Sequence, residues 1–151
     1  MSMDTILVAV GGDDEGRLDG LARTVIDLAE ATGATVAIGH IFGKEEYDRA
    51  KADLDFDPDS EVTPDVVAKR HVTVRQLGDA IAEAGLAFDW YGRIENGETK
   101  GERIVSLATE LDADLVVVGG RDRSPAGKAV FGSTAQEVML NAPCPVTFVR
   151  G

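Results

Sequence analysis

The 151-residue sequence has little cysteine, little positive charge and no long apolar run, and each shortage excludes a class of protein. A single cysteine, Cys144, rules out an intramolecular disulfide and any metal site built from several cysteines. Between Pro143 and Pro145 it is most simply a small buried apolar residue. The two histidines, His40 and His71, are far apart in the sequence, so the chain signals no nucleophile–base pair.

The balance of charge is strongly acidic. The chain contains 27 acidic and 15 basic residues, which gives a net charge of −12 at pH 7. Nucleic acids and anionic membranes recruit Lys and Arg, so this charge argues against both as the main partner. Only five of the basic residues are Lys, and Asp outnumbers Glu. This bias resembles proteins of salt-loving microbes, and it raises the expectation of a halophilic archaeal source in which salt screens a repulsive carboxylate surface.

Long apolar runs are absent as well. The first run, residues 6–10, is far too short to cross a membrane or to form the core of a signal peptide, and Asp4 precedes it. We therefore expect a soluble cytoplasmic protein with no membrane partner. A chain of this length with 44% hydrophobic residues fits one domain, 1–151, that buries its own core.

Strand and helix patterns alternate along the chain. A continuous apolar run, such as residues 6–10, is expected of a parallel strand buried on both faces. The pattern predicts further strands at 35–42, 87–94, 113–119 and 146–149. Helical spacing predicts helices at 18–29, 64–81, 99–111 and 133–141, with Gly33 ending the first, Thr63 and Pro64 starting the second and a Thr99–Glu102 capping box starting the third.

This order predicts an α/β fold with an open five-stranded parallel sheet and helices on both faces. Right-handed crossovers produce that arrangement, and ligands collect at the carboxyl ends of the strands, where the strand order reverses. Residues 43–62 interrupt the pattern. They are rich in Asp, Glu and Lys, which predicts a flexible acidic surface loop or lid.

The most informative segment is a strand, a basic loop and a helix start. The strand LVVVGG is followed by the loop 121–131, and then Gly132, Ser133 and Thr134 open a helix. The first amides of a helix have no internal partners and sit at its positive dipole end, so they suit a phosphate. If the chain holds a nucleotide, we expect it at this segment.

These residues carry a resemblance to the universal stress protein family. It rests on ILVAV in the first strand, IGHIF in the second and DADLVVVGGR in the fourth, followed by FGSTAQEVMLNAPCPVTFV. The similar region runs from about Ile6 to Val149, and residues 43–62 fall outside it. Its most specific part is the closing segment, in which a Gly-Ser pair, a short helix, an APCPV-like break and a final strand follow in order.

The resemblance implies a Rossmann-like sheet of the adenine nucleotide alpha hydrolase type, with strand order 3-2-1-4-5. It also implies a homodimer joined through the fifth strand, residues 146–149. Part of the family has an ATP site with the motif Gly, two residues, Gly, nine residues, Gly-Ser or Gly-Thr. Gly119 fills its first position and Gly132-Ser133 its last pair, and the backbone of Ile41 could meet adenine.

Two positions depart from that motif. Asp122 stands at the middle glycine, and Gly11 stands where nucleotide-binding members carry an aspartate that meets the adenosine. Asp tolerates a left-handed turn better than most residues, but its charge repels a triphosphate. Either Asp122 pairs with a flanking arginine and the loop accepts phosphate, or it turns outward and the site is altered. The cations flanking it are Arg121, Arg123 and Lys128.

Several candidate residues have a second interpretation. Ser133 with Gln136 has capping-box spacing, so Ser133 could simply cap its helix. Asp13 or Asp14 could replace the missing adenosine aspartate or bind Mg²⁺, or could only favour the dipole of the first helix. Gly119 and Gly120 could form a plain turn at the end of the strand. Arg121, Arg123 and Lys128 could form a solvated rim. For His40 and His71 a structural role is favoured over ligation.

Two functions remain open. The first is a regulatory module that binds ATP or a related adenine nucleotide, with Mg²⁺ as a companion, at the carboxyl ends of the first and fourth strands. The second is a nucleotide-free dimeric stress-response or interaction module with an unidentified protein client. The pattern predicts no catalytic residue, so we expect slow ATP hydrolysis at most.

Overall fold

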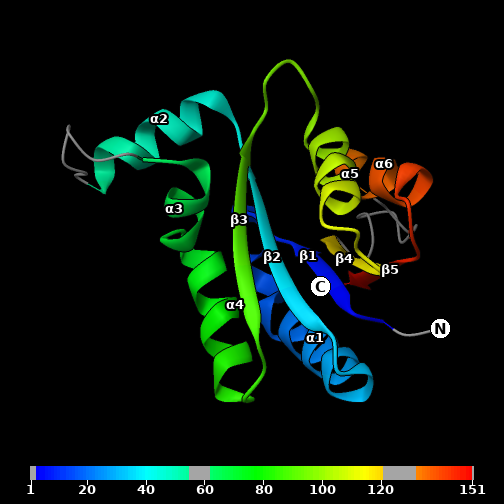
Figure 1. Ribbon diagram of the computed structural model, residues 1–151. Helices are drawn as coiled ribbons and strands as arrows, with labels where there is room; N and C mark the ends of the chain where they lie inside the picture. The colour runs from blue at the N-terminus through cyan, green and yellow to red at the C-terminus, as the bar shows by residue number, and fades with distance from the viewer. Residues whose placement is uncertain (1–2, 55–61, 121–131, 151) are drawn as a thin grey trace, which may run out of the picture.

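The computed structural model describes residues 3–54, 62–120 and 132–150, which form a parallel sheet between helices (Figure 1). The strands lie in the order β3-β2-β1-β4-β5, so the predicted fold class and strand order are confirmed. The strands are β1 (Thr5–Ala9), β2 (Thr35–Phe42), β3 (Phe88–Ile94), β4 (Leu115–Gly120) and β5 (Val146–Arg150). The helices are the 3₁₀ helix η1 (Gly12–Arg17) and the α-helices α1 (Leu18–Thr32), α2 (Lys44–Asp53), α3 (Pro64–Lys69), α4 (Val72–Glu83), α5 (Lys100–Glu110) and α6 (Ser133–Asn141).

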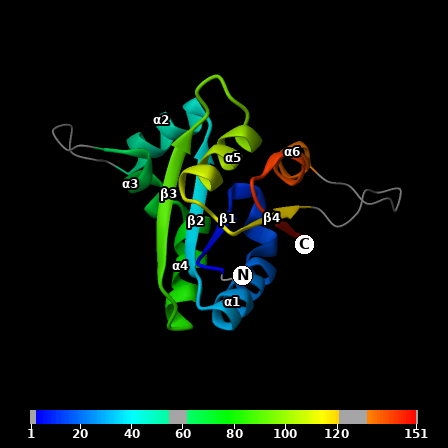
Figure 2. The same cartoon turned by 45° about the vertical axis from the view of Figure 1, so that its right-hand side comes forward.

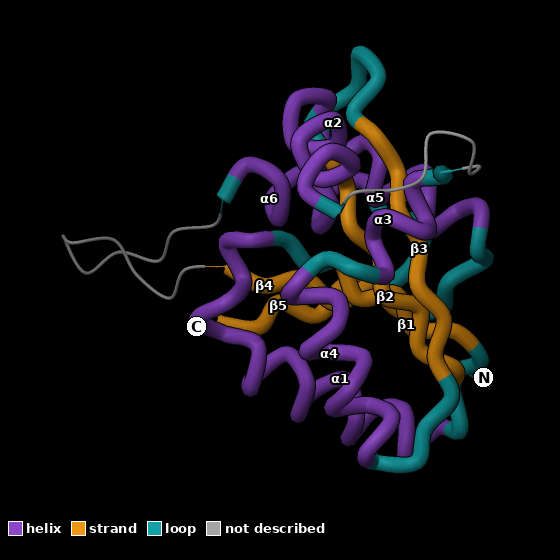
Figure 3. Tube along the Cα trace, turned by 90° about the vertical axis from the view of Figure 1, so that its left-hand side faces the viewer, coloured by secondary structure: helices purple, strands orange, loops and turns teal. Residues whose placement is uncertain are grey.

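Both faces of the sheet are buried. Ile6 and Val8 of β1 pack with α1 and α4, whereas Leu7 and Ala9 pack with α5 and α6. Figure 3 shows these two helix pairs on opposite sides of the strands. Burial of each large aliphatic side chain contributes roughly 1.5–3 kcal/mol, which explains why the central strands β1 and β4 are strongly apolar. None of the described helices is long and apolar enough to cross a membrane.

Three predicted helix boundaries are confirmed. Gly33 follows α1 with a φ of 76°, a left-handed conformation that favours glycine, and its N–H donates to the carbonyl of Ala29. The Thr63 Oγ accepts a hydrogen bond from the Val66 amide at the start of α3. The Thr99 Oγ accepts one from the Glu102 amide at the start of α5.

The prediction of a loop over 43–62 is wrong for its first half, which forms α2. The Glu46 Oε1 accepts a hydrogen bond from the Gly43 amide and so caps the helix. Tyr47 is buried, with its ring centroid 5.4 Å from that of Phe42. One aromatic anchor and a cap therefore hold a helix that is otherwise charged, a pattern too sparse to stand out in the sequence. Residues 55–61 lie outside the described part of the chain.

The single helix predicted over 64–81 is also wrong, because α3 and α4 are separate. His71 has extended backbone (φ −67°, ψ 137°) and is the N-cap of α4. Val67 of α3 packs with Phe42 in a small cluster, whereas Leu77 of α4 packs in the main core. The chain turns at His71 because α3 and α4 pack in different hydrophobic clusters. Gly92 of β3 permits this, since a Cβ there would collide with the backbone of Pro64.

Candidate functional site

A cavity of about 790 Å³ opens at the carboxyl ends of β1, β2 and β4. The strand order reverses here, because β1 continues to β2 on one side and pairs with β4 on the other. The walls come from the ends of these strands and from η1, α2, α5 and α6. The seven predicted site residues that the structure describes all line it: Gly11, Asp13, Ile41, Gly119, Gly132, Ser133 and Thr134. The other four, Arg121, Asp122, Arg123 and Lys128, lie outside the described residues.

The start of α6 forms one end of the cavity. Gly132 is the N-cap, with φ −61° and ψ 157°, and its carbonyl accepts a hydrogen bond from the Gln136 amide. Ser133 is therefore the first helical residue, and its interpretation as the cap is wrong. Ser133 and Thr134 both line the cavity. Their amides belong to the first turn, where backbone N–H groups have no partner within the helix, so this end is suited to an anion.

The two glycines that end β4 are required by close packing. A Cβ on Gly119 would lie 2.7 Å from the Arg17 Cδ and 3.0 Å from the Asp14 Oδ1. A Cβ on Gly120 would lie 2.7 Å from the Phe148 ring. The absence of a side chain at Gly119 allows η1 to pack against the end of β4. The Asp14–Arg17 ion pair of η1 therefore lies at the cavity wall. A plain strand-end turn does not account for it.

That ion pair joins Asp14 and Arg17 of η1. The Arg17 Nη1 donates to the Asp14 Oδ1 at 3.0 Å, and the Gly11 amide donates to the Asp14 Oδ2 at 2.9 Å. Burial raises the pKa of Asp14, although the Gly11 hydrogen bond and the Arg17 charge oppose the shift. Asp13, the residue selected from the sequence, is exposed and also lines the cavity. The sequence analysis did not identify Arg17 as a site residue. The three-residue spacing from Gly11 to Asp14 is typical of a capping contact and could have indicated the role of the Asp14 carboxylate.

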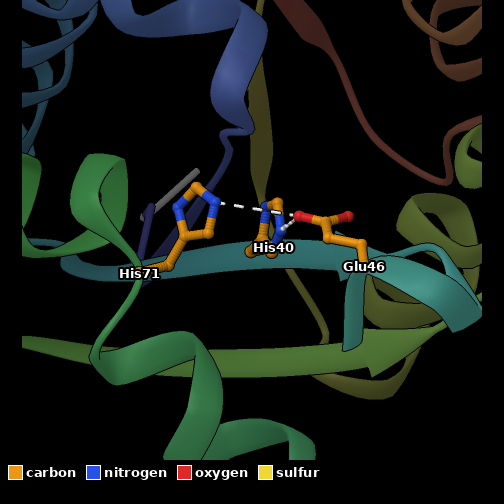
Figure 4. Close-up of side chains that lie close together, drawn as sticks. All are labelled: His40, Glu46 and His71. Carbon is orange, nitrogen blue, oxygen red and sulfur yellow. Dashed lines mark hydrogen bonds and ion pairs between the residues drawn. The ribbon is translucent and has the colours of Figure 1, made fainter. Parts of the chain in front are cut away.

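At the opposite end of the cavity, the lining residues His40 and Glu46 meet His71 (Figure 4). The Glu46 Oε2 lies 2.8 Å from the His40 Nε2 and 3.8 Å from the His71 Nε2. The two imidazole rings stack, with centroids 4.1 Å apart. His40 lies near the end of β2, Glu46 is in the first turn of α2, and His71 precedes α4. Three separate segments therefore build this cluster, which we call the histidine cluster.

The electrostatics of the histidine cluster favour neutral His71 and charged Glu46. Burial lowers the pKa of His71 to about 4, with a further contribution from His40. Burial alone would raise the pKa of Glu46, but the hydrogen bond and charge of His40 outweigh it and the pKa is lowered. Lys100 at the start of α5 also lowers it, and its side chain lines the cavity.

The His40 ring packs beside Gly11, with room for a Cβ at that position. A Cβ on Gly11 would lie 3.7 Å from the His40 Cε1, and the His40 Nδ1 lies 2.7 Å from the carbonyl oxygen of Val10. His40 is only 2% exposed. The position expected to carry an adenosine-binding aspartate is thus a contact of a buried histidine. The structural role favoured for His40 fits this packing.

The sequence profile of the universal stress protein family matches residues 3–150. The chain belongs to that family. The universal stress protein of Mycolicibacterium smegmatis is 41% identical over 49 residues, an alignment that spans 32% of this chain and 38% of that relative. The stress response protein NhaX of Bacillus subtilis is 24% identical, and the alignment covers 97% of this chain and 98% of the relative.

Solved universal stress proteins share the fold over the full length of the chain. One from Archaeoglobus fulgidus superposes with a TM-score of 0.73 and 27% identity, covering 99% of this chain and 100% of that one. A second, from the same organism in complex with dAMP, has a TM-score of 0.69 and 22% identity over 99% and 100% of the chains. A third, in complex with cAMP, has a TM-score of 0.68 and 21% identity over 99% and 98%.

Proposed function

We propose that this universal stress protein domain is a regulatory module that binds an adenine nucleotide in the cavity at the carboxyl ends of β1, β2 and β4. The start of α6 is the observation that carries the proposal. It directs first-turn amides of Ser133 and Thr134 to a cavity that also receives the basic side chains of Arg17 and Lys100. Backbone donors at a positive helix end, with cations nearby, suit phosphate oxygens. The cavity volume lies within the range of small-molecule sites.

The end of β2 supplies the recognition of the base. The Gly39 carbonyl accepts a hydrogen bond from the Val10 amide, so the backbone groups of Gly39 point toward β1. Those of Ile41, two residues on, point the same way, and β1 pairs with β2 only as far as Gly39. Ile41 therefore offers a donor and an acceptor to a planar base beyond the end of β1. Complexes of relatives with dAMP and cAMP support adenine as that base.

ATP is the proposed physiological ligand, with Mg²⁺ held by its phosphates. The exposed Asp13 carboxylate lines the cavity and provides an oxygen ligand of the kind that Mg²⁺ prefers. Arg17 is already paired with Asp14. The helix amides and Lys100 would therefore bind and neutralise much of the phosphate charge. Basic residues of the 121–131 segment lie outside the described chain and belong to the sequence-based proposal alone.

We also propose a homodimer joined through residues 146–149 of β5. This strand ends the sheet and is only partly buried in the single chain. Leu140 on the neighbouring α6 exposes 75% of its surface, a large apolar group that a second copy would cover. Light scattering at micromolar concentration tests this proposal, because a monomer mass there would contradict it.

Calorimetric titration tests nucleotide binding directly. AMP, ADP and ATP, each with and without Mg²⁺, should give heats and raise the melting temperature, whereas GTP should bind more weakly. The titrations should be repeated in molar salt, because the acidic surface repels the ligand most strongly at low ionic strength. If none of the adenine nucleotides produces heat or a thermal shift in folded protein, the nucleotide-free interaction module replaces this proposal. The carboxylates of Asp13, Asp14 and Glu46 at the cavity are the observation that favours that second function.

A further inference from the structure

The histidine cluster joins two imidazoles and a carboxylate at one point. One ligand atom from each of His40, Glu46 and His71 lies within 4.8 Å of the other two. These are the only histidines in the 151 residues, and they come from segments that the fold alone brings together. Two imidazole nitrogens and one carboxylate oxygen form a set of ligands. Such a set suits metal ions of intermediate hardness, such as Zn²⁺.

The hydrogen bonds of His40 fix which nitrogen is available. The Val10 carbonyl can only accept, so the His40 Nδ1, 2.7 Å away, carries a proton. The Nε2 of the neutral ring then presents a lone pair, yet it lies 2.8 Å from the Glu46 Oε2, which is also an acceptor. At this distance the two acceptors share a proton, and a metal ion can replace that proton once the two atoms move further apart.

His71 has the same arrangement. Its Nδ1 lies 2.8 Å from the Oγ1 of Thr73, which is itself buried. A Thr73 hydroxyl that accepts from Nδ1 leaves a lone pair on Nε2, the ring atom that a dashed line joins to Glu46 in Figure 4. In metal sites, each ligating histidine gives its other ring N–H to an oxygen, which sets its tautomer and orientation. Both histidines here have that oxygen partner.

Glu46 is oriented in a similar way. Its Oε1 accepts a hydrogen bond from the Gly43 amide, which leaves Oε2 for the histidines. The ligand atoms of a tetrahedral zinc site lie about 3.4 Å apart, given metal–ligand bonds of about 2.1 Å. The observed distances of 2.8 and 3.8 Å lie on either side of this value. A small shift of the Glu46 side chain, which is 37% exposed, would accommodate an ion.

We propose that His40, Glu46 and His71 form a binding site for a divalent transition-metal ion of the Zn²⁺ class, through the Nε2 of each histidine and the Oε2 of Glu46. The site is independent of the proposed nucleotide function, since its ligands do not include the start of α6. His40 and Glu46 line the cavity, so the remaining coordination positions face it. Water or a ligand in the cavity completes the coordination.

Titration of tag-free, EDTA-treated protein with Zn²⁺ alone, without nucleotide, tests the proposal. One ion per chain should bind, and Mg²⁺ or Ca²⁺ at the same concentration should not compete, because hard cations prefer oxygen ligands. Co²⁺ in place of Zn²⁺ should give the visible absorption of a nitrogen- and oxygen-ligated tetrahedral ion. Cys144→Ser should bind equally well, which excludes the thiol as a ligand.

Two variants and a control locate the ion. Glu46→Gln keeps an acceptor for the Gly43 amide but loses the carboxylate, and it should weaken Zn²⁺ binding at least about tenfold. His71→Asn should weaken it by a similar factor. Glu45→Gln removes the same charge from an exposed position in the same turn of α2 and should leave the affinity unchanged.

The competing occupant is a proton shared by His40 and Glu46. In that case the folded protein would bind no Zn²⁺, and nitrogen NMR would show both ring nitrogens of His40 protonated at neutral pH. Either that result or an equal Zn²⁺ affinity in wild type, Glu46→Gln and His71→Asn would overturn the proposal. A failure of nucleotide titrations would leave it untouched, because the metal titration contains no nucleotide.

Discussion

The two ends of the cavity are built in different ways. At the α6 end, consecutive residues from Gly132 to Thr134 supply the amides, and the motif can be recognised in the sequence. At the other end, His40, Glu46 and His71 come from three segments and meet only in the fold. Figure 2 shows α6 on one side of the carboxyl ends of the strands and α2 with α3 on the other.

This difference has a chemical counterpart. The α6 end offers N–H groups at a helix dipole and suits anions, whereas the histidine cluster offers lone pairs and a carboxylate and suits cations. The Asp14 carboxylate, paired with Arg17, also lines the cavity. A single cavity can therefore hold a phosphate at one end and a metal ion at the other without direct competition. Substitutions at each end can test this separation.

Gly92→Val should disrupt the histidine end most strongly. A Cβ at this position would collide with the backbone carbonyl of Pro64, so α3 cannot stay in place on β3. Overpacking of this kind costs about 1–3 kcal/mol or more, which urea denaturation should detect as a lower free energy of unfolding. Zn²⁺ binding should fall with it, because α3 leads directly to His71. A wild-type urea midpoint would show that the contact relaxes easily.

Gly132→Val should weaken nucleotide binding and leave the fold intact. Among the described residues, no heavy atom lies within 4 Å of a Cβ at Gly132, and its φ is negative. The side chain would instead obstruct approach to the first amides of α6. Loss of a hydrogen bond to a charged phosphate costs about 1.5–3 kcal/mol, or roughly tenfold or more in affinity by calorimetry. Gly16→Val is the matched control, since that site is equally open but outside the cavity lining.

Asp14→Asn should strengthen ATP binding. The substitution removes a negative charge from the cavity, keeps an acceptor for the Gly11 amide and frees the Arg17 charge. A gain of about 1 kcal/mol, or roughly fivefold, is expected from a partly screened charge. Glu15→Gln, an exposed change on the same helix that does not line the cavity, should have little effect.

The wild-type protein should show a matching pH dependence. Burial raises the pKa of Asp14, so this carboxylate loses its charge at a higher pH than an ordinary aspartate. ATP affinity should therefore increase as the pH falls through that raised pKa, and Asp14→Asn should remove this increase. If ATP affinity depends on pH in the same way in wild type and Asp14→Asn, a group other than Asp14 is responsible for the dependence.

Asp114→Asn should produce the smallest effect and touch neither end of the cavity. The Asp114 Oδ2 accepts hydrogen bonds from the amides of Asp4 and Thr5 at the start of β1, and these bonds lower the pKa of the carboxyl. A pKa lowered in the folded state gives stability above the unfolded pKa, and that stability is lost as the pH falls through the folded pKa. The variant should unfold at slightly lower urea at pH 7 and match the wild type in acid. Changed nucleotide or Zn²⁺ affinity would show coupling between the ends of the sheet.

Much of the fold could be predicted because its signals are local. The run containing Ile6 and Val8 marks a strand buried on both faces, and Gly33 and Thr63 mark helix ends by their own backbone and side-chain chemistry. The predictions were wrong where a contact between residues distant in the sequence determines the local structure. Tyr47 holds α2 only because Phe42 lies beside it, and the chain turns at His71 because α3 and α4 pack in different cores.

The candidate site divides in the same way. The alternation of strands and helices and the glycine-serine start of α6 could be predicted from the residues, since each depends on neighbouring positions. The strand order was implied by the resemblance of those segments to universal stress proteins. The folded structure was needed to show that Asp14 accepts from the Gly11 amide and pairs with Arg17, and that His40 meets Glu46 and His71. Side-chain chemistry that needs three segments within hydrogen-bonding distance has no local signal, because those distances exist only after the chain has packed.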